Sequence, residues 1–456
     1  NPTKALQWIE RWRAAGALRA LDLAFARWLH ELDASAPGSL LLAAAVLSAL
    51  EGQGHAGLPL GDDPIAGGGG APAWVLPDWP QAMRDELEPL VAQWPRDAAA
   101  ARAAWHHPRV VELDPADDLG STPLVWVSQP GSPRLVLRRY WRSEREVAAQ
   151  VRARGAMVDA TSVDDALRDA WLDRLFAPPV PGDRGAERAD TDAPDLQRLA
   201  CMHALRSGFT VITGGPGTGK TYTAARLLVL LHALHRGPAP LRVALAAPTG
   251  KAASRLRASI DAALADLQRD LATADPDRPW PAQAAEVLRL AMAKASARTL
   301  HAWLGLHRGS GRTDAQQRTL NIDVMLLDEA SMVHLELMAD LLRSLPTHAR
   351  LVLLGDRDQL ASVEAGAVLA DLCDAAVAGP QAVPVVALQG SRRFGGAIGE
   401  LAGAVHSGHG AAALAVLQRS QAEHGAVALR APADPAQLLA LLRTLGWAPG
   451  ADGAWS

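Results

Sequence analysis

Cysteine, long hydrophobic runs and excess basic charge are all scarce in this sequence. Its 456 residues include only two cysteines, Cys201 and Cys373, and neither has metal-ligating neighbours. This pattern excludes a small disulfide-stabilised fold and favours two buried thiols in a reducing, cytoplasmic setting. The longest apolar run, residues 40–50, stops at Glu51, well short of the roughly 20 residues that a membrane helix needs. We therefore expect no membrane partner.

The charge balance is slightly acidic. Lys and Arg number 45, and Asp and Glu number 49, so the formal net charge is −4. Any nucleic-acid binding must therefore use a local groove rather than a globally basic surface. A hydrophobic content of 49% with 21% charged residues is typical of globular proteins and excludes a disordered or collagen-like chain. At about 150 residues per domain, the length predicts about three domains.

The first hundred or so residues predict a helical, tryptophan-rich domain. No signal peptide precedes the first amphipathic helix, and the absence of an initial Met leads us to expect a fragment. Large apolar residues recur near helical spacing: Trp8, Ile9, Trp12, Leu18, Leu21, Phe25 and Trp28. Such a stripe is typical of a buried face. The alternative is a docking surface for a partner, because tryptophan is favoured at interfaces.

Beyond this region the pattern changes to strands, and then to alternating strands and helices. Strands at 124–127 and 134–140 flank a Pro-Gly turn, a helix is expected over 143–176, and a Pro- and Gly-rich linker over 177–194. Four short apolar segments then end in Gly, Pro or Asp: 209–213, 242–246, 323–327 and 350–354. This pattern predicts an α/β fold, in which helices cover both faces of a parallel sheet and the functional site lies at the carboxyl ends of the strands.

A complete phosphate-binding loop follows the first of these strands. Its residues match the G-x-x-x-x-G-K-[ST] pattern: Gly214, Gly215, Pro216, Gly217, Thr218, Gly219, Lys220 and Thr221. The glycines let backbone N–H groups surround phosphates, and the next helix adds the partial positive charge of its N-terminus. We expect Lys220 to reach the β- and γ-phosphates of ATP, and the Thr221 hydroxyl to bind Mg²⁺.

Two acids, Asp328 and Glu329, end the apolar strand at 323–327. Buried strands do not end in paired carboxylates for packing reasons, because an unpaired buried charge is costly. Asp328 suits the Mg²⁺ shell, through water. Glu329 suits the general base that orients and activates the attacking water.

Two glutamines lie where their side chains could hydrogen-bond to a bound nucleotide. Gln359 follows the strand at 350–354 and is expected to hydrogen-bond the γ-phosphate, whereas the neighbouring Asp356 and Asp358 are interpreted as turn residues. Gln197 comes just before the first strand and is expected to read an adenine edge. The sequence has no Asn-Lys-x-Asp guanine-binding motif, which argues against a GTPase, and a small-molecule kinase would need a lid. A mechanical ATPase fits better.

Together these motifs resemble a known family of helicases. Residues 214–223, 247–253 and 299–305 resemble motifs I and Ia and the next DNA-contact motif of superfamily 1 helicases, and residues 328–333 resemble motif II. The run 355–369 resembles motif III of the RecD family, the alpha subunits of exodeoxyribonuclease V, closely enough to identify the chain as a member.

The resemblance implies an ATP-driven motor that moves 5′ to 3′ on single-stranded DNA, beside RecB-like and RecC-like subunits in a double-strand-break repair complex. It also implies that five residues line the DNA channel: Pro248, Thr249, Lys251, Thr299 and His301. Their side chains suit phosphate contacts, and His301 or Trp303 suits base stacking, with core packing as the alternative for both. Residues 391–394 resemble motif IV with Arg392 in place of Tyr, and Arg393 would be an arginine finger.

The family pattern is incomplete towards the C-terminus, because no motif V or VI is found before Ser456. We expect a helical partner-docking domain over 1–112, a first RecA-like motor domain over 113–380 and the start of a second over 381–456. Such a fragment should hold nucleotide without unwinding DNA, so one alternative is a nucleotide-gated DNA-binding subunit. The other is a stand-alone RecD-like or relaxase-type helicase, although residues 1–120 contain no repeated Gly-x-Gly hairpin.

Overall fold

The computed structural model describes most of the chain: residues 1–60, 79–128, 133–156, 165–176, 195–272, 279–293, 295–306, 319–359, 362, 364–375, 383–389, 396–422 and 427. The chain divides into two compact units. The first comprises Asn1–Gly214 and Gly219–Leu388, and the second comprises Gly215–Thr218 and Gln389–Ser456. The expected linker at 177–194 lies outside the described residues.

The N-terminal region is helical, as expected, and also contains a small sheet. Its helices are α1 (Pro2–Ala14), α2 (Ala20–Leu32), α3 (Gly38–Glu51), α4 (Gln81–Val91) and α5 (Ala98–Trp105). The strands of the sheet lie in the order β1 (Gly57–Pro59), β4 (Arg134–Leu137), β3 (Leu124–Val127), β2 (Val111–Leu113). Strand β4 is antiparallel to both of its neighbours, and β2 is parallel to β3.

The apolar run at 40–50 forms α3, which is buried on all sides. A helix that is hydrophobic all round belongs inside a core, and here it is the centre of the N-terminal region. The ring of Trp105 lies 5.9 Å from that of Trp126 and 6.0 Å from that of Trp94, measured between centroids. Most tryptophans described in this region are therefore core residues, whereas Trp28 is 47% exposed.

The helix that follows the small sheet begins earlier than the sequence indicated. Strand β4 ends at Leu137 and α6 runs over Arg138–Gly155, so the expected strand end at 140 and helix start near 143 were wrong. The reason is tertiary: Arg138 donates a 2.6 Å hydrogen bond to the Thr122 carbonyl and forms an ion pair with Glu112. These contacts hold the first turn of α6 against the small sheet.

The larger sheet has six strands, all parallel to their neighbours, within the first unit. They lie in the order β10 (Val385–Ala387), β5 (Phe209–Thr213), β9 (Arg350–Gly355), β8 (Val324–Leu327), β6 (Val243–Ala247), β7 (Ser296–Thr299). The four strands that the sequence predicted are present within a residue or two. The short edge strands β7 and β10 were missed, and β10 lies beyond residue 380, where the first motor domain was expected to end.

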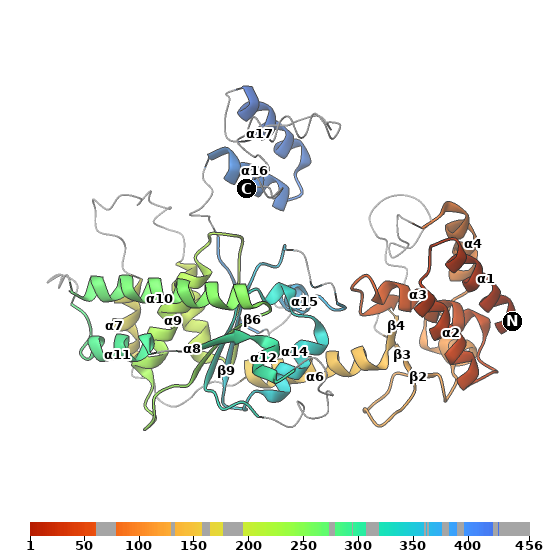
Figure 1. Ribbon diagram of the computed structural model, residues 1–456, viewed down its shortest axis with the longest axis horizontal. Helices are drawn as coiled ribbons and strands as arrows, with labels where there is room; N and C mark the ends of the chain where they lie inside the picture. The colour runs from red at the N-terminus through yellow and green to blue at the C-terminus, as the bar shows by residue number, and fades with distance from the viewer. Residues whose placement is uncertain are drawn as a thin grey trace, which may run out of the picture. The chain divides into compact units, whose positions relative to one another are not determined.

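Helices cover both faces of this sheet, each face with its own hydrophobic core (Figure 1). One face carries α7 (Asp165–Leu175), α8 (Leu196–Arg206), α9 (Lys220–Leu234), α10 (Gly250–Ala272) and α11 (Ala284–Met292). The other carries α6, α12 (Leu300–Leu304), α14 (Leu335–Ser344) and α15 (Val368–Ala375). The predicted α/β fold class, a P-loop parallel sheet after a helical N-terminal region, is confirmed.

The second unit contains two helices in its described part, α16 (Gly396–His406) and α17 (Gly410–Ala422). They fall in the stretch where the start of a second motor domain was expected, and that domain stays a prediction. Among the residues described, no helix combines the length and the apolar character required to cross a lipid bilayer.

Candidate functional site

The carboxyl ends of five neighbouring strands meet at one edge of the larger sheet. Backbone pairing puts Thr213 of β5 opposite Gly355 of β9, and Ala247 of β6 opposite Thr299 of β7. Strand β8, which precedes the two acids, lies between β9 and β6. The five motifs that the sequence singled out therefore emerge side by side, as expected for a site at the strand ends of an α/β sheet.

The phosphate-binding loop connects β5 to α9. Gly214, Gly217 and Gly219 have φ angles of +151°, +81° and +93°, which residues other than glycine rarely adopt. The Gly214 N–H donates to the Gly355 carbonyl at 3.2 Å, and Lys220 Nζ donates to the Gly214 carbonyl. Within the loop, Thr218 Oγ1 donates to the Gly215 carbonyl at 2.9 Å. Pro216 is exposed and Thr221 lies half-buried in the first turn of α9.

Gln197 reaches this loop from the first turn of α8. Asp195 caps that helix by accepting hydrogen bonds of 3.0 Å from the backbone N–H groups of Gln197 and Arg198. A Cβ built on Gly219 would lie only 2.4 Å from Gln197 Nε2. The structure thus brings the expected adenine-contacting residue against the loop, with the end of its side chain where a Cβ on Gly219 would lie.

Asp328 and Glu329 follow β8, two strands away from the loop and so about 10 Å across the sheet. Burial raises the pKa of the Asp328 carboxyl, while the hydrogen bond from the Glu329 N–H, at 2.9 Å, and the charges of Lys220 and Arg255 oppose that rise. Glu329 adopts a left-handed backbone with a φ of +54°. Such strain in a non-glycine residue costs of order 1–3 kcal/mol and tends to occur at functional sites.

Gln359 lies in the turn after β9, beside the phosphate-binding loop. Its Nε2 donates to the Asp356 carboxylate at 3.4 Å, and the Asp358 N–H donates to the same carboxylate at 3.1 Å. Asp356 is buried, whereas Gln359 is exposed. Asp356 is a turn residue, as interpreted from the sequence, and it also orients the Gln359 amide.

The candidate DNA contacts lie at the other end of the same edge. Thr249 and Thr299 cap α10 and α12, accepting hydrogen bonds of 3.2 and 3.1 Å from Ala252 N and Ala302 N. A Cβ on Gly250 would lie 4.0 Å from Thr299 Cγ2, so the two caps are neighbours. Lys251 and His301 are exposed beside them, and Pro248 is half-buried.

Trp303 is half-buried and bonded to the sheet, as in the core-packing alternative. Its Nε1 donates to the Leu245 carbonyl of β6 at 3.0 Å, and the Arg298 guanidinium lies 5.3 Å from its ring centroid. Arg298 is exposed and has no carboxylate partner in the part of the chain that the structure describes. The sequence interpretation missed Arg298, although a basic residue directly before Thr299 was a usable signal.

One expected site residue has no structural account. Arg393, the proposed arginine finger, and its neighbour Arg392 lie outside the described residues. The structure therefore brings the nucleotide candidates of β5, β8 and β9 and the DNA candidates of β6 and β7 to one edge, without placing Arg393.

Two family models match the chain. Residues 14–130 match the model described as RecBCD enzyme subunit RecD, N-terminal domain, and residues 197–365 match the model described as AAA domain. The second match begins at Gln197 and includes the phosphate-binding loop, the two acids and Gln359. An AAA domain implies the use of a nucleotide.

Curated proteins with similar sequences carry the same description. RecBCD enzyme subunit RecD of Mycobacterium tuberculosis (strain ATCC 25618 / H37Rv) is 41% identical over 289 residues, which are 63% of this chain and 44% of that protein. The corresponding Mycolicibacterium smegmatis protein is 42% identical over 62% of this chain and 44% of its own length. The ATP-dependent RecD2 DNA helicase of Deinococcus radiodurans is 31% identical over 54% of this chain and 27% of its own length. The chain spans less than half the length of these relatives.

Proposed function

We propose that this chain, a relative of RecBCD enzyme subunit RecD, is the ATP-hydrolysing motor of a DNA helicase subunit that moves 5′ to 3′ along single-stranded DNA. It would act in the cytoplasm, within a helicase–nuclease complex that repairs double-strand breaks. The observation that carries the proposal is the shared sheet edge, where nucleotide candidates on β5, β9 and β8 adjoin DNA candidates on β6 and β7. Polarity and membership of the complex rest on the likeness to RecD.

The residues at the edge suit the hydrolysis of ATP. Backbone N–H groups of the loop and Lys220 Nζ bind the phosphates, and Gln197 contacts the adenine. Glu329 takes a proton from the water that attacks the γ-phosphorus, and Gln359 contacts the transferred phosphoryl group. The bond from the γ-phosphorus to the bridging oxygen breaks as the new one forms. Arg393 remains the proposed arginine finger.

The same residues suit Mg²⁺. The Asp328 carboxyl is half-buried and its pKa is raised, so a nearby divalent cation would offset the cost of holding it ionised. Thr221 Oγ1 and Asp328, through water, would hold the ion. When bound, Mg²⁺ neutralises charge on the β- and γ-phosphates.

Single-stranded DNA would lie across the ends of β6 and β7. The Thr249 and Thr299 hydroxyls already accept backbone hydrogen bonds, which fixes their direction and leaves each O–H able to donate to a phosphate. Lys251 and Arg298 add positive charge, and His301 offers an exposed ring, while Pro248 shapes the turn. Phosphate contacts of this kind make binding sensitive to salt.

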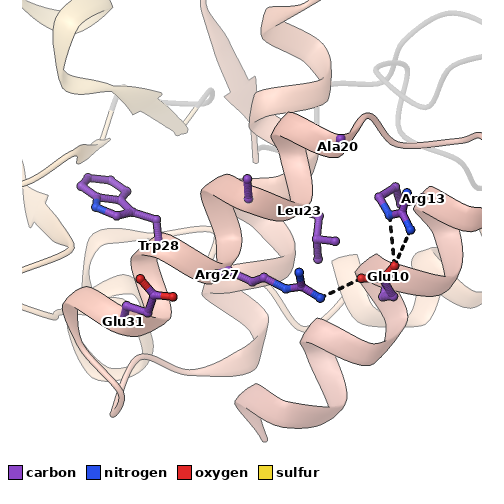
Figure 2. Close-up of a pocket in the computed structure, with 8 residues that line it drawn as sticks. Glu10, Arg13, Ala20, Leu23, Arg27, Trp28 and Glu31 are labelled. Atoms are coloured by element: carbon purple, nitrogen blue, oxygen red, sulfur yellow. Dashed lines mark hydrogen bonds and ion pairs between the residues drawn. The ribbon is translucent and has the colours of Figure 1, made fainter.

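The N-terminal region would dock a RecB-like or RecC-like subunit. A groove of about 460 Å³ lies between α1 and α2, and Trp28, Leu23, Arg13, Arg27, Glu10 and Glu31 are among the residues that line it (Figure 2). Glu10 holds Arg13 and Arg27 at 2.6 and 2.8 Å. Trp28 stacks on Phe25 and is 47% exposed. An exposed tryptophan with paired charges around it is typical of a protein interface.

Strand displacement tests the proposed function. The complete gene product, alone and with its partner subunits, should unwind a 5′-tailed duplex with saturating Mg-ATP and leave a 3′-tailed duplex intact. Lys220→Gln should abolish unwinding. Unwinding of the 3′-tailed duplex alone would contradict the polarity, and DNA binding without ATP hydrolysis would favour the nucleotide-gated binding subunit.

A further inference from the structure

The turn that follows α3 in the N-terminal region is hydrogen-bonded to the loop that contains Gln359. The Gly366 N–H donates to the Gly54 carbonyl at 3.1 Å. Both glycines have left-handed backbones, with φ angles of +93° at Gly54 and +102° at Gly366. A Cβ on Gly366 would also lie 2.6 Å from the Leu335 Cβ. Contact between the two turns therefore depends on residues without side chains.

The residues just before Gly366, Glu364 and Ala365, also contact the start of α14. The Leu335 N–H donates to the Ala365 carbonyl at 3.3 Å, and His334 Nε2 lies 2.8 Å from Glu364 Oε2. Helix α14 itself follows closely after Glu329 in the chain. The segment Glu364–Gly366 is thus fixed between the helix that follows the proposed catalytic base and the turn after α3.

Glu51, the last residue of α3, anchors that turn to the motor. It accepts hydrogen bonds of 3.0 Å from Tyr140 Oη and 2.9 Å from Arg139 Nη2. The Tyr140 ring is buried in the same core as α14 and β9. Burial also raises the pKa of Tyr140, so its hydroxyl stays protonated and able to donate.

The turn is connected in the other direction to α2, which lines the groove of Figure 2. Asp22 of α2 is fully buried and accepts hydrogen bonds from the Arg19 N–H at 2.7 Å and from Ser48 Oγ of α3 at 2.7 Å. Arg19 Nη2 also lies 3.7 Å from Glu51. A continuous set of polar contacts therefore runs from the start of α2 to Glu51.

We propose that the α3 turn is a positioning element for the Gln359 loop, with Gly54 and Glu51 as positioning residues. Gly54 holds Gly366, which is seven residues after Gln359 in the chain, and this anchor would restrict where Gln359 lies beside the phosphate-binding loop. A partner bound in the groove would then influence how strongly the γ-phosphate is recognised, through α2 and α3. This proposal rests on the proposed function, in which Gln359 contacts the γ-phosphate.

Nucleotide affinity ratios test the proposal with matched variants. Mg-ATPγS and Mg-ADP differ in the terminal phosphate, so the ratio of their dissociation constants isolates the reading of that phosphate. Gly54→Ala should reduce the preference for ATPγS by about 2- to 30-fold, the range expected for coupling between distant sites, with ADP affinity unchanged. Gly16→Ala is the control, because Gly16 is also left-handed at +79° and has open space around it.

A second pair of variants keeps the test valid if the glycine variants fail to fold. Glu51→Gln should reduce the same ratio, whereas Glu86→Gln should not. Glu86 also pairs with an arginine and an aromatic N–H, accepting from Arg11 and from Trp12 Nε1, but within the N-terminal region alone. Equal ratios for Gly54→Ala and Gly16→Ala, and for the two Glu variants, would overturn this proposal alone. A parent chain that binds neither nucleotide would overturn it together with the proposed function.

Discussion

Gln197 and Gly219 are in such close contact that even a methyl group on the glycine would collide with the glutamine amide, at 2.4 Å from Nε2. The contact joins α8 to the last glycine before Lys220, where α9 begins. The amide therefore lies beside the phosphate-binding loop, where we expect it to contact a bound nucleotide.

We expect Gln197→Ala to weaken ATP binding by about 2- to 12-fold, the effect of one lost hydrogen bond, and to leave GTP binding unchanged. The comparison of the two nucleotides separates adenine recognition from damage to the phosphate-binding loop. Gln93→Ala is the control, since that amide donates to the Pro89 carbonyl of α4 in the N-terminal region. An equal loss for ATP and GTP would contradict an adenine-reading role.

Lys220→Gln and Glu329→Gln should separate phosphate binding from hydrolysis. Loss of the Lys220 cation should prevent retention of Mg-ATP. Loss of the Glu329 base should leave Mg-ATP bound while slowing DNA-stimulated hydrolysis by about 10²–10⁴-fold. Both are measured on the complete gene product, by nucleotide fluorescence and phosphate release. Hydrolysis at the parent rate by Glu329→Gln would show that another group activates the water.

Lys251→Ala and Arg298→Ala should each weaken binding of single-stranded DNA. Each should also reduce the slope of log affinity against log salt by about 1, the value expected for one lost phosphate contact. Arg236→Ala is the control, because Arg236 is also exposed but precedes β6, at the opposite edge of the sheet. The measurement is fluorescence anisotropy with a labelled oligonucleotide over a salt series. An unchanged slope for Arg298→Ala would remove this residue from the DNA interface.

Replacement of Asp328 and of Asp323 by asparagine should change the melting temperature in opposite directions. Burial raises the folded-state pKa of Asp328, so the protonated carboxyl favours the folded state and this contribution is lost as pH rises through that pKa. Asp328→Asn should therefore raise the melting temperature at pH 7–8 without nucleotide. Hydrogen bonds from Arg242 lower the pKa of Asp323, so its contribution is present above the unfolded pKa of about 3.9. Asp323→Asn should therefore lower the melting temperature at neutral pH.

Thermal denaturation between pH 3 and pH 8 checks both variants. The difference for Asp328→Asn should diminish towards acid, where the parent Asp328 carboxyl is also protonated. The difference for Asp323→Asn should begin to diminish only near the unfolded pKa of about 3.9, because the lowered pKa keeps the folded-state carboxylate ionised. A lower melting temperature for Asp328→Asn at pH 8 would mean that its carboxylate is stabilised by its surroundings, contrary to the cause given for its pKa.

Trp28→Ala should weaken association with the RecB-like or RecC-like subunit by about 30-fold, the effect of losing an interface hot spot of about 2 kcal/mol. ATP hydrolysis by the isolated chain should not change, because Trp28 lies in the groove between α1 and α2 and not at the strand ends of the larger sheet. Leu119→Ala is the control, since Leu119 is 89% exposed outside the groove. Full retention of the partners by Trp28→Ala in a pull-down would contradict the groove as the docking surface.

The sequence by itself determined the features that depend on neighbouring residues. The loop glycines, Lys220 and the acids after β8 are adjacent in the chain, and a strand, turn and helix in succession leave few other arrangements. The four central strands were predictable for the same reason, because strands buried on both faces are continuous apolar runs. The start of α6 was not, because contacts of Arg138 with a strand and a loop from earlier in the chain decide it.

Only the tertiary structure decided which distant segments meet. Edge strands β7 and β10 are short, and β7 is only partly buried, so their pairing partners define them more than their own residues do. The hydrogen bond between Gly54 and Gly366 joins segments that are more than 300 residues apart, and neither segment carries a sequence pattern that indicates the other. Glycine permits the left-handed backbone at both positions, but a hydrogen bond between two backbone groups leaves no sequence pattern that identifies its partner, so the contact could not be predicted from either segment.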